Sequence, residues 1–166
     1  GCIYSMLPDM ESGKFHFASA LTAGGWQDDV TVAVDAAGLI ASVTPGVKEG
    51  FHIKGIAVPA VPNVHSHAHQ RLMLGLVERA GPGADSFWTW RETMYRFALT
   101  MTPEDVEAVA AQLYVEMLEA GFTRVGEFHY LHHDRDGRPY GELAEMANRI
   151  AAAAADAQLA EVYSLF

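Results

Sequence analysis

The chain has 166 residues, 50% of them hydrophobic, which is the size of one ordinary domain with enough apolar side chains for a sizeable core. Its formal charge of -10 argues against nucleic acid and anionic membranes as partners, because both attract basic surfaces. A single cysteine excludes an intramolecular disulfide and fits a cytoplasmic location, and no apolar run approaches the roughly 20 residues that span a bilayer.

The first third of the chain predicts a small β-unit. After a loose leader over residues 1–13, residues 30–34 alternate with period two, residues 35–38 form a turn, and residues 39–43 resume the strand pattern. Pro45 and Gly46 break the chain again. Residues 14–55 therefore predict three or four short strands, which are too thin to hold a core without partner strands.

The pattern changes at Gly55, and residues 56–166 predict alternating strands and helices. Residues 56–58 are apolar and predict a buried strand that leads into the turn around His65 and His67. Residues 70–77 suggest a short helical or loop segment, and residues 81–85 a loop. The aromatic residues Phe87 and Trp88 are expected to pack in the core.

The clearest helix lies between Thr102 and Gly121. Thr102 is a good N-cap, Pro103 suits the first helical position, and Gly121 is the expected stop. A strand follows over residues 122–130, then a turn-rich loop over 134–139 and an Ala-rich helix over 142–159. This order predicts an α/β fold with a parallel sheet, whose functional groups lie at the C-terminal ends of the strands.

His65 and His67 are the candidate metal ligands. Residues two apart on a strand point to the same face, so these imidazoles are expected to meet at one point. Imidazole suits zinc and its neighbours, and a catalytic zinc has about three protein ligands and an open position for water. The pair is thus half of a site that would activate water. The alternative is a His-rich loop without any ligand role.

The other histidines near strand ends carry weaker signals. His69 comes after the strand has ended, and we interpret it as a side chain behind the ligands or facing solvent rather than as a ligand. His129 is expected behind the site or in the core. His132 and His133 precede an acidic loop and are expected to face solvent.

Three segments of the chain carry a resemblance to a known family. Residues 59–67 resemble the first-strand signature of the amidohydrolase superfamily. More narrowly, residues 65–70, 85–96 and 127–134 resemble formimidoylglutamate deiminases of histidine degradation, and the likeness runs from about Phe15 to about Gln158. The sequence departs from the family at His69, where an aromatic residue is usual, and at Ala60, where glycine is usual.

The resemblance implies a (β/α)8 TIM barrel, of which residues 56–166 would form the first two βα units, with residues 14–55 as part of a small β-sandwich. It implies one zinc ion, or iron or manganese in its place, held by His65 and His67 and by a His and an Asp from later strands. The reaction would turn N-formimidoyl-L-glutamate and water into N-formyl-L-glutamate and ammonia, with its base on a strand beyond Phe166.

The resemblance also implies three substrate-binding residues. Gln70 is expected to hydrogen-bond the substrate, Arg91 to pair with a carboxylate of a small dicarboxylate, and Tyr130 to donate its hydroxyl. From the residues alone, Arg91 could equally form a surface ion pair with Glu92 or Asp85, and Tyr130 could equally pack at the barrel rim.

The end of the chain prompts a further expectation. The family would enter its third strand after about Gln158, whereas residues 159–166 do not show its usual apolar run, so we expect an N-terminal fragment that is inactive alone, of a parent that is a homodimer. Two alternatives remain open. One is another amidohydrolase, such as an aromatic-base deaminase or a chlorohydrolase, and the other is a non-catalytic metal-binding fragment.

Overall fold

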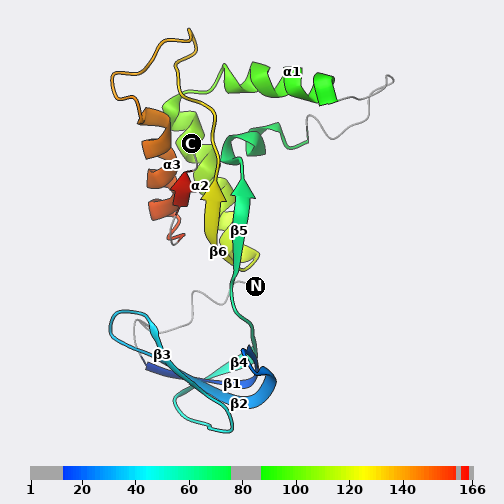
Figure 1. The fold of residues 1–166 in the computed structure, drawn as a ribbon, viewed down its shortest axis with the longest axis vertical. Coiled ribbons are helices and arrows are strands. Elements are labelled where there is room, and N and C mark those ends of the chain that lie inside the picture. The colour runs from blue at the N-terminus through cyan, green and yellow to red at the C-terminus, as the bar shows by residue number, and fades with distance from the viewer. Residues whose placement is uncertain (1–12, 76–86, 160–161, 165–166) are drawn as a thin grey trace. The chain divides into compact units, whose positions relative to one another are not determined.

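The computed structural model describes residues 13–75, 87–159 and 162–164 (Figure 1). The expected leader, apart from Gly13, and the loop over 81–85 lie outside the described residues. The chain divides into two compact units, Gly1–Ala60 and Val61–Phe166. No helix in the described part of the chain is long and apolar enough to cross a membrane.

The first unit contains a four-stranded sheet. Its strands are β1 (Gly13–Thr22), β2 (Gly25–Val34), β3 (Ile40–Thr44) and β4 (Phe51–Ala57), in the order β3-β2-β1-β4. The β1–β2 and β2–β3 pairs are antiparallel and joined by short turns, whereas β4 runs parallel to β1. The expected strands over 30–34 and 39–43 are confirmed, with β2 beginning five residues earlier, at Gly25.

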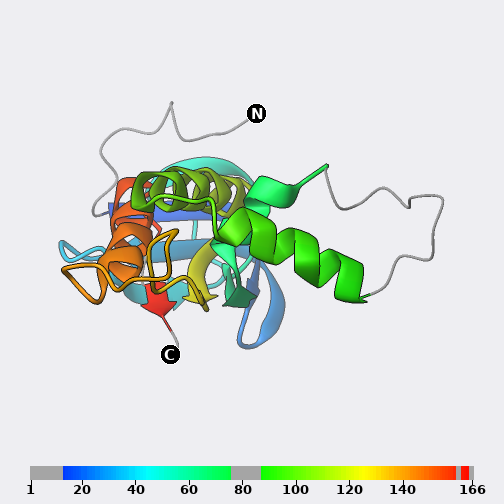
Figure 2. The ribbon, with the colours of Figure 1, turned by 90° about the horizontal axis from the view of Figure 1, so that it is seen from above.

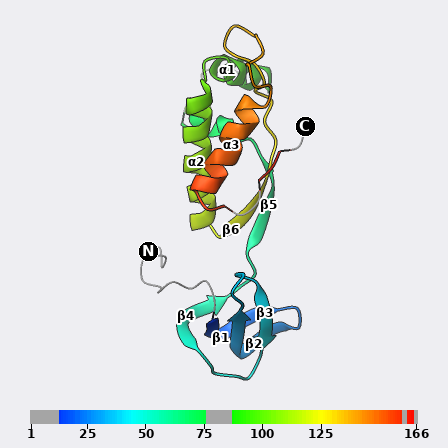
Figure 3. The ribbon, with the colours of Figure 1, turned by 90° about the vertical axis from the view of Figure 1, so that its left-hand side faces the viewer.

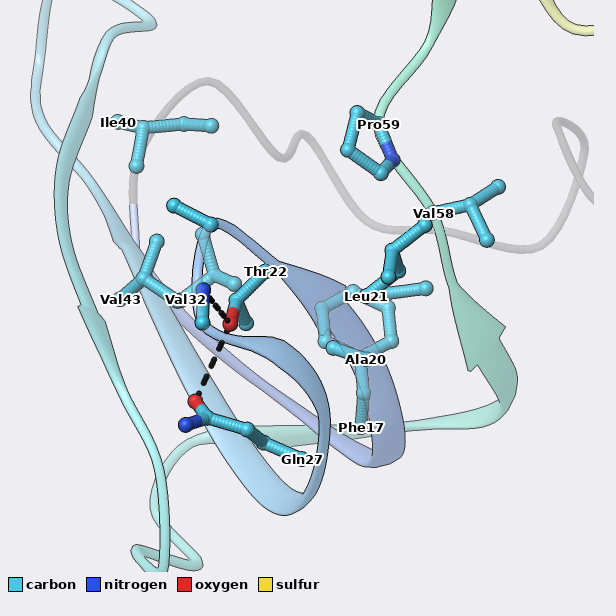
Figure 4. Close-up of a pocket in the computed structure, with 13 residues that line it drawn as sticks. Phe17, Ala20, Leu21, Thr22, Gln27, Val32, Ile40, Val43, Val58 and Pro59 are labelled. Carbon is cyan, nitrogen blue, oxygen red and sulfur yellow. Dashed lines mark hydrogen bonds between the residues drawn. The ribbon is translucent and has the colours of Figure 1, made fainter.

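Residues of β1, β2 and β3, together with residues 57–59, line an open apolar cavity of about 610 Å³ (Figure 4). Leu21, Ile40, Val43 and Val58 line it and are all exposed. The expectation of a buried strand over residues 56–58 is wrong. Ile56 is 67% exposed, and the strand that leads to His65 is a separate one. An apolar run signals burial only where a second layer covers it.

The second unit is built on a parallel sheet. Its strands are β5 (Val61–Ser66), β6 (Phe122–Glu127) and β7 (Val162–Ser164), in the order β5-β6-β7. Between them lie the 3-10 helix η2 (Ala68–Met73) and the helices α1 (Phe87–Ala98), α2 (Pro103–Glu119) and α3 (Glu145–Asp156). The arrowheads of β5 and β6 point toward η2 and α1, so these two elements lie at the C-terminal edge of the sheet (Figure 1).

Two helices cover one side of this sheet. Figure 3 shows α2 and α3 side by side on one side of the sheet, where α2 contacts β6 and α3 contacts β7. The expected N-terminus of α2 is confirmed. The Thr102 hydroxyl accepts a hydrogen bond from the Asp105 amide, and the Asp105 carboxylate accepts one from the Thr102 amide. Val106, Ala110 and Tyr114 recur at helical spacing along α2. They are buried in one core with Ile150 of α3 and Val125 of the sheet.

Two expectations about the second unit are wrong. Phe87 and Trp88 are 64% and 63% exposed, because they belong to α1, a helix that extends away from α2 and α3 (Figure 2). The departure expected after Gln158 is also wrong. Residues 162–164 form the third parallel strand, with Val162 beside Val125 of β6. A three-residue strand is too short for its sequence pattern to stand out.

Candidate active site

His65 lies in a bulge at the C-terminal end of β5. Asn63 pairs with Val125 and Ser66 pairs with Glu127, so two residues of β5, Val64 and His65, stand opposite one residue of β6. The side-chain oxygen of Asn63 accepts a hydrogen bond from the His65 amide at 3.2 Å, which holds the bulge. Bulges turn side chains away from the regular pleat and are common beside active sites.

His65 and His67 direct their rings at each other. The two Nε2 atoms lie 3.0 Å apart, and the rings meet nearly at right angles. The Nδ1 atom of His67 lies 2.7 Å from the carbonyl oxygen of Phe128. A carbonyl oxygen can only accept, so Nδ1 carries the proton and Nε2 presents its lone pair toward His65. This arrangement suits two nitrogen ligands of one metal ion.

Gln70 and Tyr130 meet next to this pair. The amide nitrogen of Gln70 donates to the Tyr130 hydroxyl at 2.7 Å, and that hydroxyl lies 3.1 Å from the sulfur of Met94 on α1. The ring of Tyr130 also approaches that of His67, with centroids 5.7 Å apart. Burial raises the pKa of Tyr130, which therefore remains a hydrogen-bond donor at neutral pH.

Arg91 projects from α1 between two aromatic rings. Its guanidinium carbon lies 5.6 Å from the centroid of the Trp88 ring and 5.1 Å from that of Tyr95. Both distances are within the range of a cation–π contact. Glu92 forms no ion pair with Arg91 among the described residues, and Asp85, the other partner considered, lies outside them.

Most of these side chains line one open cavity of about 250 Å³. Of the five candidate residues only His65 is not part of its wall; Phe87, Trp90 and Tyr95 supply aromatic surface, and Met94 completes the lining. The complete lining is His67, Gln70, Phe87, Trp90, Arg91, Met94, Tyr95 and Tyr130. The cavity thus combines two hydrogen-bonding groups and one cation beside the histidine pair.

The remaining histidines separate into buried and exposed ones. His69 is 3% exposed, so the expectation that it could face solvent is wrong. Its ring stands edge-on to Tyr130, and burial lowers its pKa to about 4. His129 is buried, as expected, and burial lowers its pKa also. His132 and His133 are exposed, which confirms the expectation for them.

The histidine pair remains a partial metal site. Among residues 13–75, 87–159 and 162–164, no group of three or more His, Cys, Asp or Glu side chains could hold a metal ion. A catalytic zinc has about three protein ligands, so a complete site requires at least one ligand besides His65 and His67.

Sequence reasoning missed several side chains around this site. Trp90 and Tyr95 line the cavity, although no expectation was attached to either. Glu127 is fully buried and accepts a hydrogen bond from the amide of Ala68, which follows His67. It begins one of the segments that resemble the family, and its local signal is an acidic residue within an otherwise apolar strand end. Such a residue is rarely buried without a partner, and this is the clue that could have drawn attention to it.

Comparisons with known proteins identify the family of the chain. Residues 56–163 match the model of the amidohydrolase family, and residues 14–50 match that of the formimidoylglutamate deiminase HutF N-terminal domain. The chain belongs to the amidohydrolase family.

Within that family, the chain is 49% identical over 140 residues to a formimidoylglutamate deiminase from Pseudomonas aeruginosa, an alignment that covers 83% of this chain and 31% of the relative. This similarity confirms the resemblance seen in the sequence.

Solved structures show the same fold. An amidohydrolase from Brucella melitensis is 55% identical, with a TM-score of 0.83, and the match covers 92% of this chain and 34% of that one. An atrazine chlorohydrolase from Arthrobacter aurescens TC1, complexed with zinc and atraton, is 19% identical, with a TM-score of 0.70, over 92% of this chain and 35% of that one. These matches confirm the expected α/β amidohydrolase fold. The chain spans about a third of the length of these relatives.

Proposed function

We propose that this chain supplies part of the active site of a metal-dependent deiminase. The reaction is the hydrolysis of N-formimidoyl-L-glutamate to N-formyl-L-glutamate and ammonia, in the cytoplasmic degradation of histidine. The observation that carries the proposal is the cavity wall, where Gln70, Arg91 and Tyr130 converge beside His67. The 49% identity to a formimidoylglutamate deiminase supports the choice of substrate.

In this proposal His65 and His67 hold the metal, which is zinc by preference, with iron or manganese as alternatives. The fit rests on the facing Nε2 atoms and on the carbonyl of Phe128, which keeps the proton of His67 on Nδ1. When bound, such a metal supplies a Lewis acid that makes water a stronger acid and a better nucleophile.

The other candidate residues orient the substrate. Arg91 meets a carboxylate, for which a guanidinium offers two parallel hydrogen bonds. The flanking rings of Trp88 and Tyr95 keep the guanidinium beside the cavity. Without substrate, the amide nitrogen of Gln70 donates one hydrogen bond to the Tyr130 hydroxyl. The amide oxygen of Gln70 can still accept a hydrogen bond from a substrate atom, and the Tyr130 hydroxyl can still donate one. Arg91 thus accounts for one carboxylate of the proposed partner, a small dicarboxylate, and a homodimer is the proposed state of the parent enzyme.

The aromatic lining favours one alternative. Phe87, Trp90 and Tyr95 could stack a planar ring, as an aromatic-base deaminase or a chlorohydrolase would require. A neutral ring would have no use for Arg91, so the dependence on this cation separates the two functions.

A chimera provides the test. This chain replaces the matching segment of the Pseudomonas aeruginosa relative, and ammonia release from N-formimidoyl-L-glutamate is measured. Loss of hydrogen bonds to a charged group costs about 1.5–3 kcal/mol, so Arg91→Met should raise KM about ten- to a hundredfold. Arg96→Met, on the same helix but outside the cavity lining, is the matched control. Equal KM values for the two variants would contradict a dicarboxylate substrate.

The isolated chain provides a second test. Two histidines alone leave a metal site incomplete, so the chain by itself should release no ammonia above a control with free zinc. Measurable activity would instead show that the side chains of these 166 residues suffice.

A further inference from the structure

Glu127 is a charged residue with no exposed surface. It ends β6, and its side chain is 0% exposed. One carboxylate oxygen accepts a hydrogen bond from the amide of Ala68 at 2.7 Å. The other accepts one from the hydroxyl of Tyr114 on α2 at 3.2 Å. Burial raises the pKa of Tyr114, which stays a donor. A buried carboxylate is costly, so its position needs a reason beyond filling space.

Its contact with Ala68 is one of three hydrogen bonds that hold the turn formed by Ser66, His67 and Ala68 at the end of β5. The carbonyl of Ser66 accepts from the Phe128 amide at 2.9 Å. The ring of His67 donates to the Phe128 carbonyl at 2.7 Å, and the amide of Ala68 donates to Glu127. Three consecutive residues of the turn are therefore each bound to the last residue of β6 or to the one after it.

Of these three contacts, only the one from Glu127 depends on the identity of a β6 side chain. The two contacts to Phe128 use its backbone and would form with any residue at that position. The turn also continues into the site, because the amide of Gln70 donates to the carbonyl of His67 at 2.9 Å. A shift at Ala68 would thus move His67 on one side and Gln70 on the other.

We propose that Glu127 is a positioning residue for the histidine pair. Its carboxylate fixes the amide of Ala68, and this keeps the ring of His67 on the Phe128 carbonyl with Nε2 directed at His65. Hydrogen-bonded partners behind metal ligands typically change metal affinity about 10–100-fold when removed. The inference rests on the proposed metal site, but its effect on the His67 ring does not require a metal.

The first experiment measures the ring of His67 in the metal-free 166-residue chain by ¹⁵N NMR. The wild-type ring is expected to carry its proton on Nδ1. Glu127→Gln retains an oxygen that accepts from Ala68 and should keep this tautomer. Glu127→Leu has no acceptor and Glu127→Asp is one methylene too short, so both should shift the proton toward Nε2. Unchanged ring signals in the Leu and Asp variants would overturn the proposal. If the Leu variant does not fold, the Asp variant decides.

The second experiment measures the zinc affinity of the chimera, in which the remaining ligands are supplied, by competition with a chromophoric chelator. Because Glu127 acts on His67 through Ala68, Glu127→Leu and Glu127→Asp should weaken binding by about 10-fold, the lower end of the range for a direct partner of a ligand, and Glu127→Gln much less. Ile150→Ala is the control, because it opens the buried core on α3 without a hydrogen bond to the turn. If Ile150→Ala weakens zinc binding as much as Glu127→Leu, then Glu127 serves stability alone and the proposal fails.

A failure of the proposed metal site would look different. In that case His65→Ala would bind zinc as tightly as the wild type. The tautomer of His67 would still report whether Glu127 positions the ring, so the two ideas can fail separately.

Discussion

Gly126 is the residue of β6 that stands opposite the bulge in β5, and its lack of a side chain permits the close approach of Val64. A Cβ atom at position 126 would lie 3.0 Å from the Val64 carbonyl oxygen, 3.2 Å from its carbon and 3.4 Å from its Cα. All three are backbone atoms, which cannot rotate away as a flexible side chain would. In Gly126→Ala the backbone of Val64 must therefore shift by a few tenths of an ångström, and His65, the next residue, shifts with it.

The loss of stability in Gly126→Ala can be estimated from other over-packed proteins. An extra methyl or methylene group in a tightly packed site typically lowers the free energy of unfolding by about 1–3 kcal/mol. For a chain of this size each kcal/mol lowers the unfolding temperature by about 2–4 °C, so Gly126→Ala should unfold about 2–12 °C below the wild type. The assay is thermal unfolding followed by circular dichroism. Gly141→Ala is the matched control, because a Cβ there meets no atom within 4 Å. Equal unfolding temperatures for the two variants would refute the close approach at the bulge.

Three further predictions concern stability. Thr102→Ala removes the hydroxyl that caps α2 and should cost about 1 kcal/mol in urea unfolding, whereas Thr102→Ser should not; equal losses would contradict a capping role. Gly50→Ala should destabilise strongly, since the backbone is left-handed there, with φ 83°, and a Cβ would lie 2.0 Å from the Lys14 carbonyl oxygen; normal expression and melting would contradict this. Hydrogen bonds from Arg71 lower the pKa of Glu116 to about 2, so the stabilisation is present above pH 4.5 and is lost as pH falls toward 2; Glu116→Gln should flatten this acid dependence in unfolding titrations.

His69 is a buried histidine that packs against an aromatic ring. It is 3% exposed, and its ring stands edge-on to that of Tyr130. Neither ring nitrogen has a hydrogen-bond partner among the described residues. The imidazole therefore occupies the space of an aromatic ring, and its low pKa keeps it neutral.

The net charge of the chain does not describe the charge of the candidate site. The formal charge is -10, yet the proposed substrate is an anion. Arg91 is the one cation that lines the cavity, and no acidic side chain lines it in the described part of the chain. Net charge therefore constrains large charged partners better than it constrains a small ligand in a pocket.

The sequence by itself determined the local features. The period-two alternation of residues 30–34 specifies a strand, and Thr102, Pro103 and Asp105 specify where α2 begins, because these signals act over a few residues. The pair His65 and His67 could be recognised for the same reason, and the likeness to one family followed from short motifs that include Arg91 and Tyr130.

Only the tertiary structure decided what depends on contacts between distant residues. Burial of Ile56 and Trp88 requires a second layer, which their own sequence cannot reveal, and both are exposed. The third strand exists because Val162 pairs with Val125, and the bulge because Gly126 admits Val64. Glu127 contacts Ala68 across 59 positions of the chain, a separation at which no sequence periodicity operates.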